Sequence, residues 1–457
     1  MLDTKALRSA SIYKLLPQFA IPAILSGLIS AVYNIVDQIF IGRVVGLLGN
    51  AATNIAFPVV LLCTAVSIMA GVGCSAGFNL ASGKQRQEEA GCFVGQCLDL
   101  LLLLGLGIGA VTLVFLQPLL ILFGSTAAVL PYAHSYLGLV AWGIPFSILG
   151  VGGSIIIRSD GSPGYALGAV LAGAVLNVVL DAWFMLGLDL GMAGAAGATV
   201  IGQALTMVLV LRYFRHFKTL SLVRAYFWPV RLTYLQRIAA LGMGPLINHA
   251  SMSVVQLLLN NTLKYYGALS LYGSDIPLAA VGVITKLNTI FTAVIIGIAQ
   301  GVQPIISFNY GAGQYDRVRE AARKALLVML VFSWGFFFCC QLLPRQLVSI
   351  FGSGPEEYFI FAERYLRIFM LLVCVNGLQI TAGNIFTSIG KASLSVFISL
   401  TRQLFFLPPL ILLLPLYFGL EGVLYAGPAA DAMCVAVAVY LLGREDKRLR
   451  QLQEKKR

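Results

Sequence analysis

The stretch Phe78-Asn79-Leu80-Ala81-Ser82-Gly83, with Arg86 after it, returns later in the chain as Phe308-Asn309-Tyr310-Gly311-Ala312-Gly313, with Arg317 after it. The two copies begin at residues 78 and 308, 230 residues apart in a chain of 457. Four further matches keep the same order and nearly the same spacing: Pro22 with Pro245, Leu122-Phe123-Gly124-Ser125 with Ile350-Phe351-Gly352-Ser353, Tyr136-Leu137 with Tyr365-Leu366, and Gly191-Met192-Ala193-Gly194 with Gly419-Leu420-Glu421-Gly422. The sequence therefore predicts two similar halves.

The composition is that of a membrane protein. Hydrophobic residues make up 59% of the chain and charged residues only 11%, which excludes a soluble domain. Apolar runs long enough to span the hydrocarbon core as helices recur along the chain. We place twelve of them, at roughly 15–39, 52–77, 92–116, 134–157, 164–186, 192–212, 238–263, 277–302, 322–343, 364–388, 393–416 and 419–442. The expected fold is an all-α integral membrane protein with twelve transmembrane helices.

One long polar connection, 213–237, lies between the sixth and seventh predicted helices. We expect a six-helix bundle at 1–212, a cytoplasmic linker at 213–237, and a second bundle at 238–457 that ends in a basic cytoplasmic tail. Repeated halves in a membrane are typical of transporters, in which the binding site lies between the halves and they rock around it. A cleavable signal peptide is not expected, because Met1–Lys14 is polar and the apolar segment after it is too long.

Lysine and arginine residues predict the orientation. When alternate loops are assigned to opposite sides, the side with both termini receives nearly all of them, and the other side receives little beyond Arg43, Lys264 and Arg345. Cytoplasmic loops are rich in these residues, so both termini are expected in the cytoplasm. The net charge of +12 therefore does not indicate a nucleic-acid partner, since the basic residues are spread over many loops.

Motifs for enzymatic chemistry are absent. The eight cysteines include no CxxC pair, the three histidines are scattered, and the chain has no Walker A, HExxH or GxSxG sequence. We therefore expect neither an enzyme nor a cofactor. Without ATP machinery, uphill transport would have to use an ion gradient.

The informative residues are polar ones inside predicted helices, because a charge there is costly and is usually functional. Asp37 shares a helical face with Tyr33 and Asn34, and Asn177 shares a face with Asp181, four residues further on. Two carboxylates, an amide and a phenol can form either a proton site or an oxygen-ligand cation site.

Other intramembrane charges leave alternatives open. Asp99 is interpreted as a structural residue near the cytoplasmic interface. Lys286, Arg402 and Asp431 all fall in the second half, where an ion pair among them is as good an interpretation as a role in substrate binding.

A further group of motifs carries a family resemblance. They are Pro22 followed by Val36-Asp37-Gln38-Ile39-Phe40-Ile41-Gly42, Gly297-Ile298-Ala299-Gln300-Gly301-Val302-Gln303-Pro304-Ile305 followed by Asn309-Tyr310-Gly311-Ala312, the pair Asn177 and Asp181, and Ala193-Gly194-Ala195-Ala196 followed by Thr199. On these residues the chain resembles the multidrug and toxic compound extrusion (MATE) transporters, in particular their bacterial DinF-like and MepA-like members. The resemblance extends over nearly the whole chain.

The resemblance implies two pseudo-symmetric six-helix bundles around a V-shaped cavity in a bacterial cytoplasmic membrane. It also implies antiport of H⁺ or Na⁺ against cationic or amphipathic drug-like compounds, by a chain that we expect to be a monomer without an obligate protein partner. The resemblance implies that the cation-coupling residues are Asp37, Asn177, Asp181, Thr199 and Tyr33. All of these except Tyr33 would also be ligands of a Na⁺ ion. We predict substrate contacts at Asn34, Gln256, Asn260, Gln300 and Arg402.

The second half departs from the family pattern. Other branches use acidic residues of the seventh and eighth helices for a cation site, and this chain has Asn260, Asn261 and Lys286 there instead. Cation coupling is therefore expected in the first half. Asp431 and Glu421 are the nearest acidic substitutes in the second half.

Two other functions remain as alternatives. A flippase for lipid-linked saccharides would need several Arg and Lys residues around its cavity, and the first-half helices have almost none. A membrane receptor or structural protein is disfavoured by the repeat and by the ionisable residues within the spans.

Overall fold

The computed structural model describes residues 4–273, 275–351 and 355–455, and within these ranges the chain is helical and has no strand. Eleven of the described helices are long and apolar enough to cross a membrane. A twelfth span forms if α13 (Glu356–Phe369) and α14 (Val373–Ser388), which are bent by 50° relative to each other, count as one. The expectation of an all-α protein with twelve transmembrane helices is confirmed on this count, and the chain is a multi-pass membrane protein.

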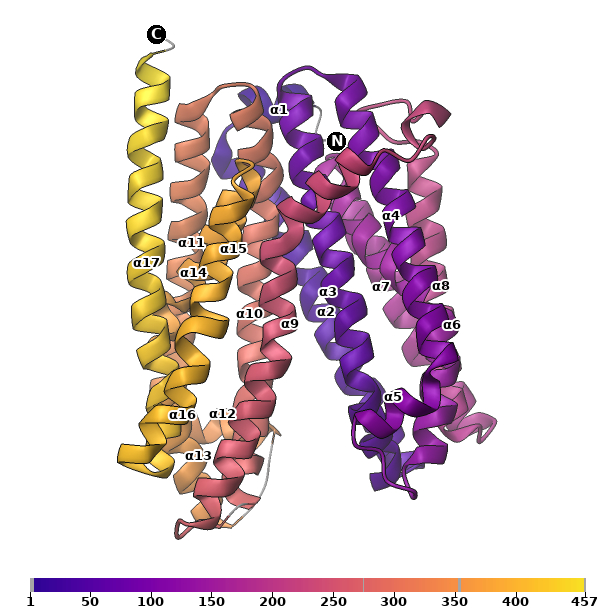
Figure 1. The fold of residues 1–457 in the computed structure, drawn as a ribbon, viewed down its shortest axis with the longest axis vertical. Helices are drawn as coiled ribbons and strands as arrows, with labels where there is room; N and C mark the ends of the chain where they lie inside the picture. The colour runs from indigo at the N-terminus through magenta and orange to yellow at the C-terminus, as the bar shows by residue number, and fades with distance from the viewer. Residues whose placement is uncertain (1–3, 274, 352–354, 456–457) are drawn as a thin grey trace.

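The first half forms one group of helices (Figure 1). Most run beyond the predicted apolar segments, because helical structure continues into the polar flanks. The elements are α1 (Thr4–Ser9), α2 (Ile12–Val44), α3 (Leu47–Gly83), α4 (Gln87–Val114), α5 (Leu116–Leu122), α6 (Leu130–Ser159), α7 (Pro163–Asp181), η1 (Ala182–Gly187) and α8 (Gly191–Phe214).

The second half forms the other group. Its elements, after the short linker helix η2 (Arg224–Tyr226), are α9 (Leu232–Ala268), α10 (Asp275–Gly311), α11 (Tyr315–Leu342), α12 (Pro344–Phe351), α13, α14, α15 (Ala392–Leu400), η3 (Thr401–Phe406), α16 (Leu407–Phe418) and α17 (Leu420–Glu454). The segments η1 and η3 are π-helical: η1 ends the fifth span, and η3 interrupts the eleventh span near its middle. Such π segments occur frequently at functional sites.

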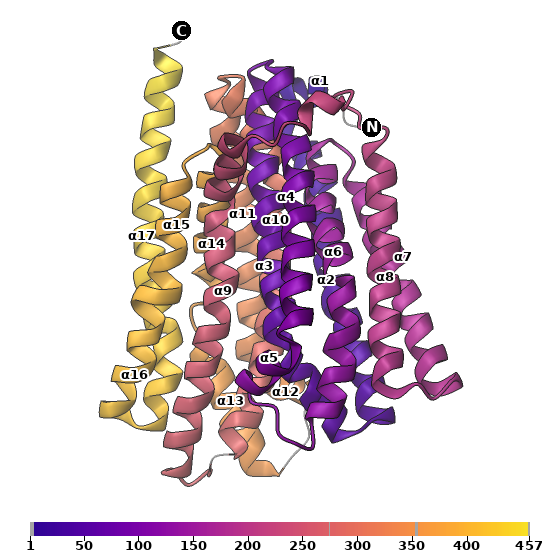
Figure 2. The same ribbon diagram turned by 45° about the vertical axis from the view of Figure 1, so that its right-hand side comes forward.

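The two groups converge at one end of the molecule and diverge toward the other (Figure 1). Both termini and the linker lie at the converging end, which we call the terminal side. The turned view in Figure 2 shows α3 and α10 in the middle of the molecule, with α8 toward one edge and α17 toward the other.

The repeated motifs meet each other on the terminal side. A Cβ atom added to Gly83 would lie 2.1 Å from the carbonyl oxygen of Phe308, and one added to Gly311 would lie 2.3 Å from the carbonyl oxygen of Leu80. Only glycine allows backbones to come this close. The duplication noticed in the sequence is therefore also the surface on which the halves touch.

A second pair of glycines joins α3 to α9 on the same side. The added Cβ of Gly73 would lie 2.0 Å from the oxygen of Ile238, and that of Gly242 would lie 1.9 Å from the oxygen of Met69. Small residues of this kind let membrane helices pack closely.

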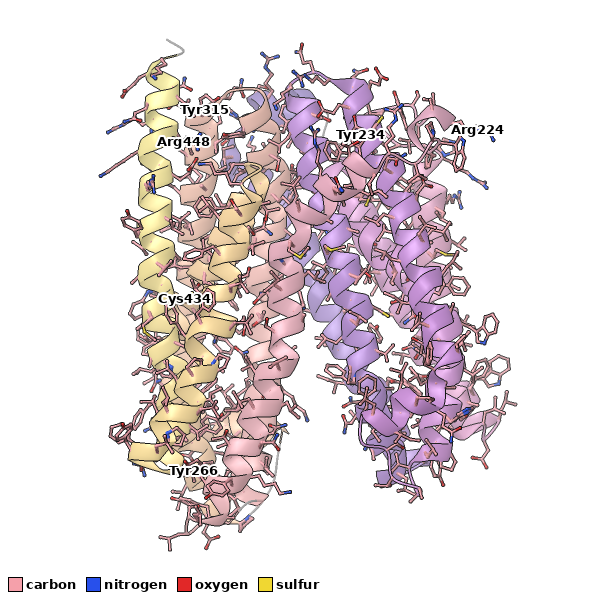
Figure 3. All side chains as sticks on the ribbon, in the orientation of Figure 1. Arg224, Tyr234, Tyr266, Tyr315, Cys434 and Arg448 are labelled. Atoms are coloured by element: carbon pink, nitrogen blue, oxygen red, sulfur yellow. The ribbon has the colours of Figure 1, made fainter. Side chains whose placement is uncertain are left out.

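Away from the terminal side the same helix faces separate. On α10, Gly297 packs against Ile24 of α2. Lys286, about three helical turns nearer the opposite end of α10 on roughly the same face, is exposed, and so is Asn34 on α2. The halves diverge toward the side opposite to the termini, and the space between them there is called the cleft (Figure 1 and Figure 3).

The linker is held by two buried polar side chains of the first half. Asp160 accepts hydrogen bonds from the amides of Lys218 (2.7 Å) and Thr219 (3.0 Å) near the linker's start. Gln96 donates to the carbonyls of Tyr226, Phe227 and Pro229 and accepts from the amide of Arg231 (2.6 Å) at its end. Both side chains are at most 2% exposed. The linker is therefore fastened to the first half at both ends.

Candidate cation and substrate sites

Two carboxylates are buried inside the first group of helices. Asp37 on α2 is 7% exposed and Asp181 at the end of α7 is fully buried. Oδ1 of Asp37 and both carboxylate oxygens of Asp181 have no hydrogen-bond partner among the described residues. An unpaired buried charge is strongly unfavourable, so this arrangement needs a proton or a cation to neutralise it.

The two acids belong to one cluster, because α2 packs against α7. Asp37 and Asp181 interact electrostatically with each other, and both interact with Tyr33 and Tyr136. Tyr136 comes from α6 and is 8% exposed. The sequence prediction missed Tyr136 as a site residue, although the repeat of Tyr136-Leu137 at Tyr365-Leu366 was a signal that could have singled it out.

Asn177 and Thr199 lie beside the acids. Asn177 is one helical turn before Asp181 on α7, and its Nδ2 donates to Oγ1 of Thr199 on α8 at 3.5 Å. Its Oδ1 is buried without a partner among the described residues. The π segment η1 begins directly after Asp181. The structure thus gathers the predicted cation-coupling residues, Tyr33 included, between α2, α7 and α8.

The oxygen atoms of this cluster fit a hard monovalent cation or a proton. Carboxylate, amide and hydroxyl oxygens are the ligands such cations prefer, and the unpartnered oxygens supply a carboxylate from each acid and the amide of Asn177. No group of three or more His, Cys, Asp or Glu residues suited to a metal ion occurs in the described part of the chain. The cluster therefore suits H⁺ or Na⁺ better than a transition metal.

A cavity adjoins the cluster between α2, α6, α7 and α8. It encloses about 560 Å³, including space open to solvent, and Tyr33, Asn177 and Thr199 line it. Small, apolar and uncharged polar side chains form the rest of its wall, and no charged residue lines it. Such a wall suits an amphipathic organic molecule whose charge is met by the neighbouring carboxylates.

Hydrogen bonds within α2 engage Asn34. Oγ of Ser26 donates to the carbonyl of Pro22 (2.8 Å), Oγ of Ser30 to that of Ser26 (3.0 Å), and Nδ2 of Asn34 to that of Ser30 (2.7 Å). Side chains bonded to the carbonyl four residues earlier tend to bend helices. The amide of Asn34 is exposed but is already engaged within its own helix.

In the second half, Asp431, one of the two nearest acidic substitutes for the cation site of other branches, forms an ion pair. Nε of Arg402 lies 2.7 Å from Oδ1 of Asp431, and Nδ2 of Asn376 donates to the other oxygen of Asp431 at 2.8 Å. Glu421, the other acidic candidate, pairs with Arg364 at 2.6 Å. Each acid is therefore already neutralised by an arginine.

Three of the remaining predicted substrate residues line two further cavities. Gln256, which donates to Oδ1 of Asn260 at 2.9 Å, lines a cavity within the second half together with Arg402. Gln300 accepts from Nη2 of Arg158 at 2.8 Å and lines a cavity between α3 and the second half. The predicted substrate residues are thus spread over three places and do not form one site.

Asp99, interpreted above as a structural residue, is half-buried on α4. Its Oδ2 is buried and has no hydrogen-bond partner among the described residues.

Comparison with known proteins agrees with the geometry. The MatE family model matches residues 22–183 and 251–412, one segment in each half. The multidrug export protein MepA of Staphylococcus haemolyticus is 24% identical over 437 residues, covering 95% of this chain and 94% of that protein. An FAD transporter of Shewanella oneidensis is 25% identical over 458 residues, covering 97% of each.

A solved structure is also similar. The MATE multidrug transporter DinF-BH, solved in complex with a ligand, is 34% identical, has a TM-score of 0.86, and is matched over 94% of this chain and 95% of that chain. The family model matches one segment in each half, as the internal repeat predicts, and the similar solved structure shares the fold. The chain belongs to the MATE family, whose members are transporters and not enzymes.

Proposed function

We propose that the protein is a cation-coupled antiporter that exports drug-like compounds across the bacterial cytoplasmic membrane. The observation that carries the proposal is the pair of buried carboxylates, Asp37 and Asp181, with unpartnered oxygens beside an uncharged cavity. Membership in the MATE family and the similarity to multidrug export proteins support it. The coupling ion is H⁺ or Na⁺, and the working unit is a monomer in the lipid bilayer.

The distribution of charge supports a cytoplasmic terminal side. Arg224 of the linker and Arg448 of α17 lie toward this side, and Tyr266 lies at the other end (Figure 3). Because basic residues are retained in the cytoplasm, the cleft described above opens to the outside. The structure then corresponds to the state that releases substrate and takes up the cation.

Coupling follows from the cost of the buried charges. In the outward state a cation enters the cleft and neutralises the cluster of Asp37 and Asp181, which weakens the attraction for a positively charged substrate. α2 then repacks or bends near Pro22, where proline removes a backbone hydrogen bond. Cation and substrate drive the cycle because each has a different affinity for the two states.

The substrate class follows from the first-half cavity. Its uncharged wall and the adjacent carboxylates fit cationic or amphipathic organic compounds. The multidrug transporter DinF-BH and the MepA multidrug export proteins support this class. Because an FAD transporter also matches the whole chain, FAD belongs in the panel of test compounds.

A flippase for lipid-linked pyrophosphates is less well supported. Among the cavities within the helices, Arg402 is the one arginine or lysine in the linings that the structure describes, and Asp431 already pairs with it. A pyrophosphate would need several unpaired basic groups.

The test is transport by purified protein in proteoliposomes. Gradients of pH and of Na⁺ are imposed separately, and movement of ethidium and of FAD is followed. We expect one gradient to drive ethidium and the other to have little effect. Transport that ignores both gradients would contradict antiport, and transport of FAD alone would contradict the proposed substrate class.

A further inference from the structure

The second half contains a cavity that the coupling scheme does not use. It lies between α9, α10, α13, α14 and η3 and encloses about 860 Å³, including space open to solvent. Its wall combines aromatic and aliphatic side chains with hydrogen-bonding ones, among them Asn248, His249, Tyr365 and Arg402. No aspartate or glutamate lines it. The chemistry of this cavity is therefore the reverse of the acidic cluster in the first half.

Tyr365 is the first sign of a ligand. Its side chain is fully buried, it lines the cavity, and its hydroxyl has no hydrogen-bond partner among the described residues. Buried hydroxyl groups are nearly always hydrogen-bonded, and an unpaired one destabilises the protein. Tyr365 is also the repeat counterpart of Tyr136, the tyrosine beside Asp37. The structure thus keeps a tyrosine at the matching place while the acids around it are gone.

Arg402 is the second sign. Nε of its guanidinium bonds to Asp431, and the second oxygen of Asp431 is taken by Asn376. The two terminal nitrogens, Nη1 and Nη2, make no hydrogen bond to any residue in the described part of the chain, and Arg402 lines the cavity. The ion pair thus fixes the guanidinium and leaves its terminal edge for a ligand.

We propose that this cavity is a second binding site, for the carboxylate of an aromatic organic anion. The terminal nitrogens of Arg402 would bind the carboxylate, since a guanidinium edge matches the geometry of that group. The hydroxyl of Tyr365 donates a further hydrogen bond. The ring of Phe369, which packs on Tyr365 with centroids 5.3 Å apart, covers the aromatic body of the ligand. An organic cation is disfavoured, because the cavity offers it no free carboxylate.

Binding to the purified full-length protein in detergent tests the site without requiring transport. The probes are 1-naphthoate and its neutral counterpart 1-naphthamide, measured by calorimetry. We expect naphthoate to bind about tenfold more tightly than naphthamide, because hydrogen bonds to a charged acceptor are stronger. Equal affinities, or no binding of naphthoate, would overturn the proposal.

Tyr365→Phe separates binding from folding. The hydroxyl makes no hydrogen bond to the described residues, so its removal should not lower the unfolding temperature and should weaken naphthoate binding about tenfold. Tyr358→Phe, on the same helix but outside the cavity wall, is the matched control and should bind normally. Arg402→Lys keeps the charge opposite Asp431 but loses the planar edge, and it should also weaken binding. Normal affinity in Tyr365→Phe and Arg402→Lys would refute the site.

The outcome is independent of the proposed coupling. Asp37→Asn lies in the other half and should bind naphthoate as the unmodified protein does, even if it no longer transports. A loss of naphthoate binding in Asp37→Asn would move the anion site to the first half and overturn the assignment to Tyr365 and Arg402.

Discussion

At the scale of single residues, the proposed coupling depends on the side chain of Asp37. Its carboxylate is buried in a membrane-spanning helix, and Oδ1 has no partner among the described residues. Asp37→Asn removes the group that takes up the cation but keeps its shape. We expect gradient-driven efflux to fall to the background level while the protein still folds into the membrane.

Ethidium efflux from cells that produce Asp37→Asn at normal levels measures this. The amount of protein in the membrane is the control. Unchanged efflux would rule out Asp37 as a coupling residue.

Asp181 should act together with Asp37, because the two acids lie in one cluster between α2 and α7 and influence each other electrostatically. If they share one cation, either substitution alone empties the site. The double variant Asp37→Asn with Asp181→Asn should then be about as defective as each single one, since substitutions in contact are not additive.

Asn260→Ala is the matched second-half variant, because Asn260 accepts its hydrogen bond from Gln256 and faces no free acid. It should spare ion coupling and at most change substrate preference. A loss of coupling in Asn260→Ala, together with normal coupling in Asp181→Asn, would place the cation site in the second half.

At the scale of elements, hydrogen bonds from Gln96 attach the linker to the first half. Gln96 in α4 binds three carbonyls and one amide of residues 226–231. Gln96→Ala leaves these backbone groups unpaired, at a cost of about 1–3 kcal/mol each where they stay buried. We expect faster hydrogen exchange in 224–231 and a lower unfolding temperature.

Hydrogen exchange followed by mass spectrometry reports on this segment. The control is Gln87→Ala on the same helix, since Gln87 is exposed and should tolerate the change. Equal protection of 224–231 in both variants would mean that Gln96 does not hold the linker.

At the scale of the whole molecule, close contact between the two halves on the terminal side depends on glycines. A Cβ at residue 242 would lie 1.9 Å from the oxygen of Met69, so a side chain there forces α9 away from α3. Gly242→Val should therefore disfavour the outward-open state and favour a state open at the terminal side. Gly107→Val is the control, because nothing lies within 4 Å of that position.

Spin labels at Arg86 and Arg323, exposed positions of the two halves on the terminal side, measure the distance between them. The distance should lengthen in Gly242→Val and stay unchanged in Gly107→Val. An unchanged distance in Gly242→Val would show that the halves close without this contact.

Orientation in the membrane is tested by cysteine labelling. Among the described cysteines only Cys339 is exposed, so Cys339→Ser provides a background with little labelling of native cysteines. A reagent that cannot cross the membrane should label Leu271→Cys from outside the cell and should not label Ser221→Cys in the linker. Labelling of Ser221→Cys from outside would reverse the proposed orientation.

Several properties could be predicted from the sequence because they depend on residues close together in the chain. Hydropathy over about 20 residues determines a membrane-spanning helix, and this alone predicted an all-α protein with twelve spans. The spacing of Asn177 and Asp181 places them on one helical face without knowledge of any neighbour. The internal repeat predicted two halves for the same reason, since it is visible by comparing the chain with itself.

Which residues meet across helices was decided only by the tertiary structure. Tyr136 of α6 joins Asp37 and Asp181 because α7 packs against both α6 and α2. The sequence around Tyr136 does not show which face of α6 turns toward these helices. The glycines of the repeated motifs touch each other, and Arg402 pairs with Asp431 and leaves Lys286 in the cleft, because helix packing sets these distances. Asn34 is exposed, yet its amide bonds within α2. Hydrophobicity determines which segments span the membrane, whereas close packing between the spans determines which side chains come together in a site.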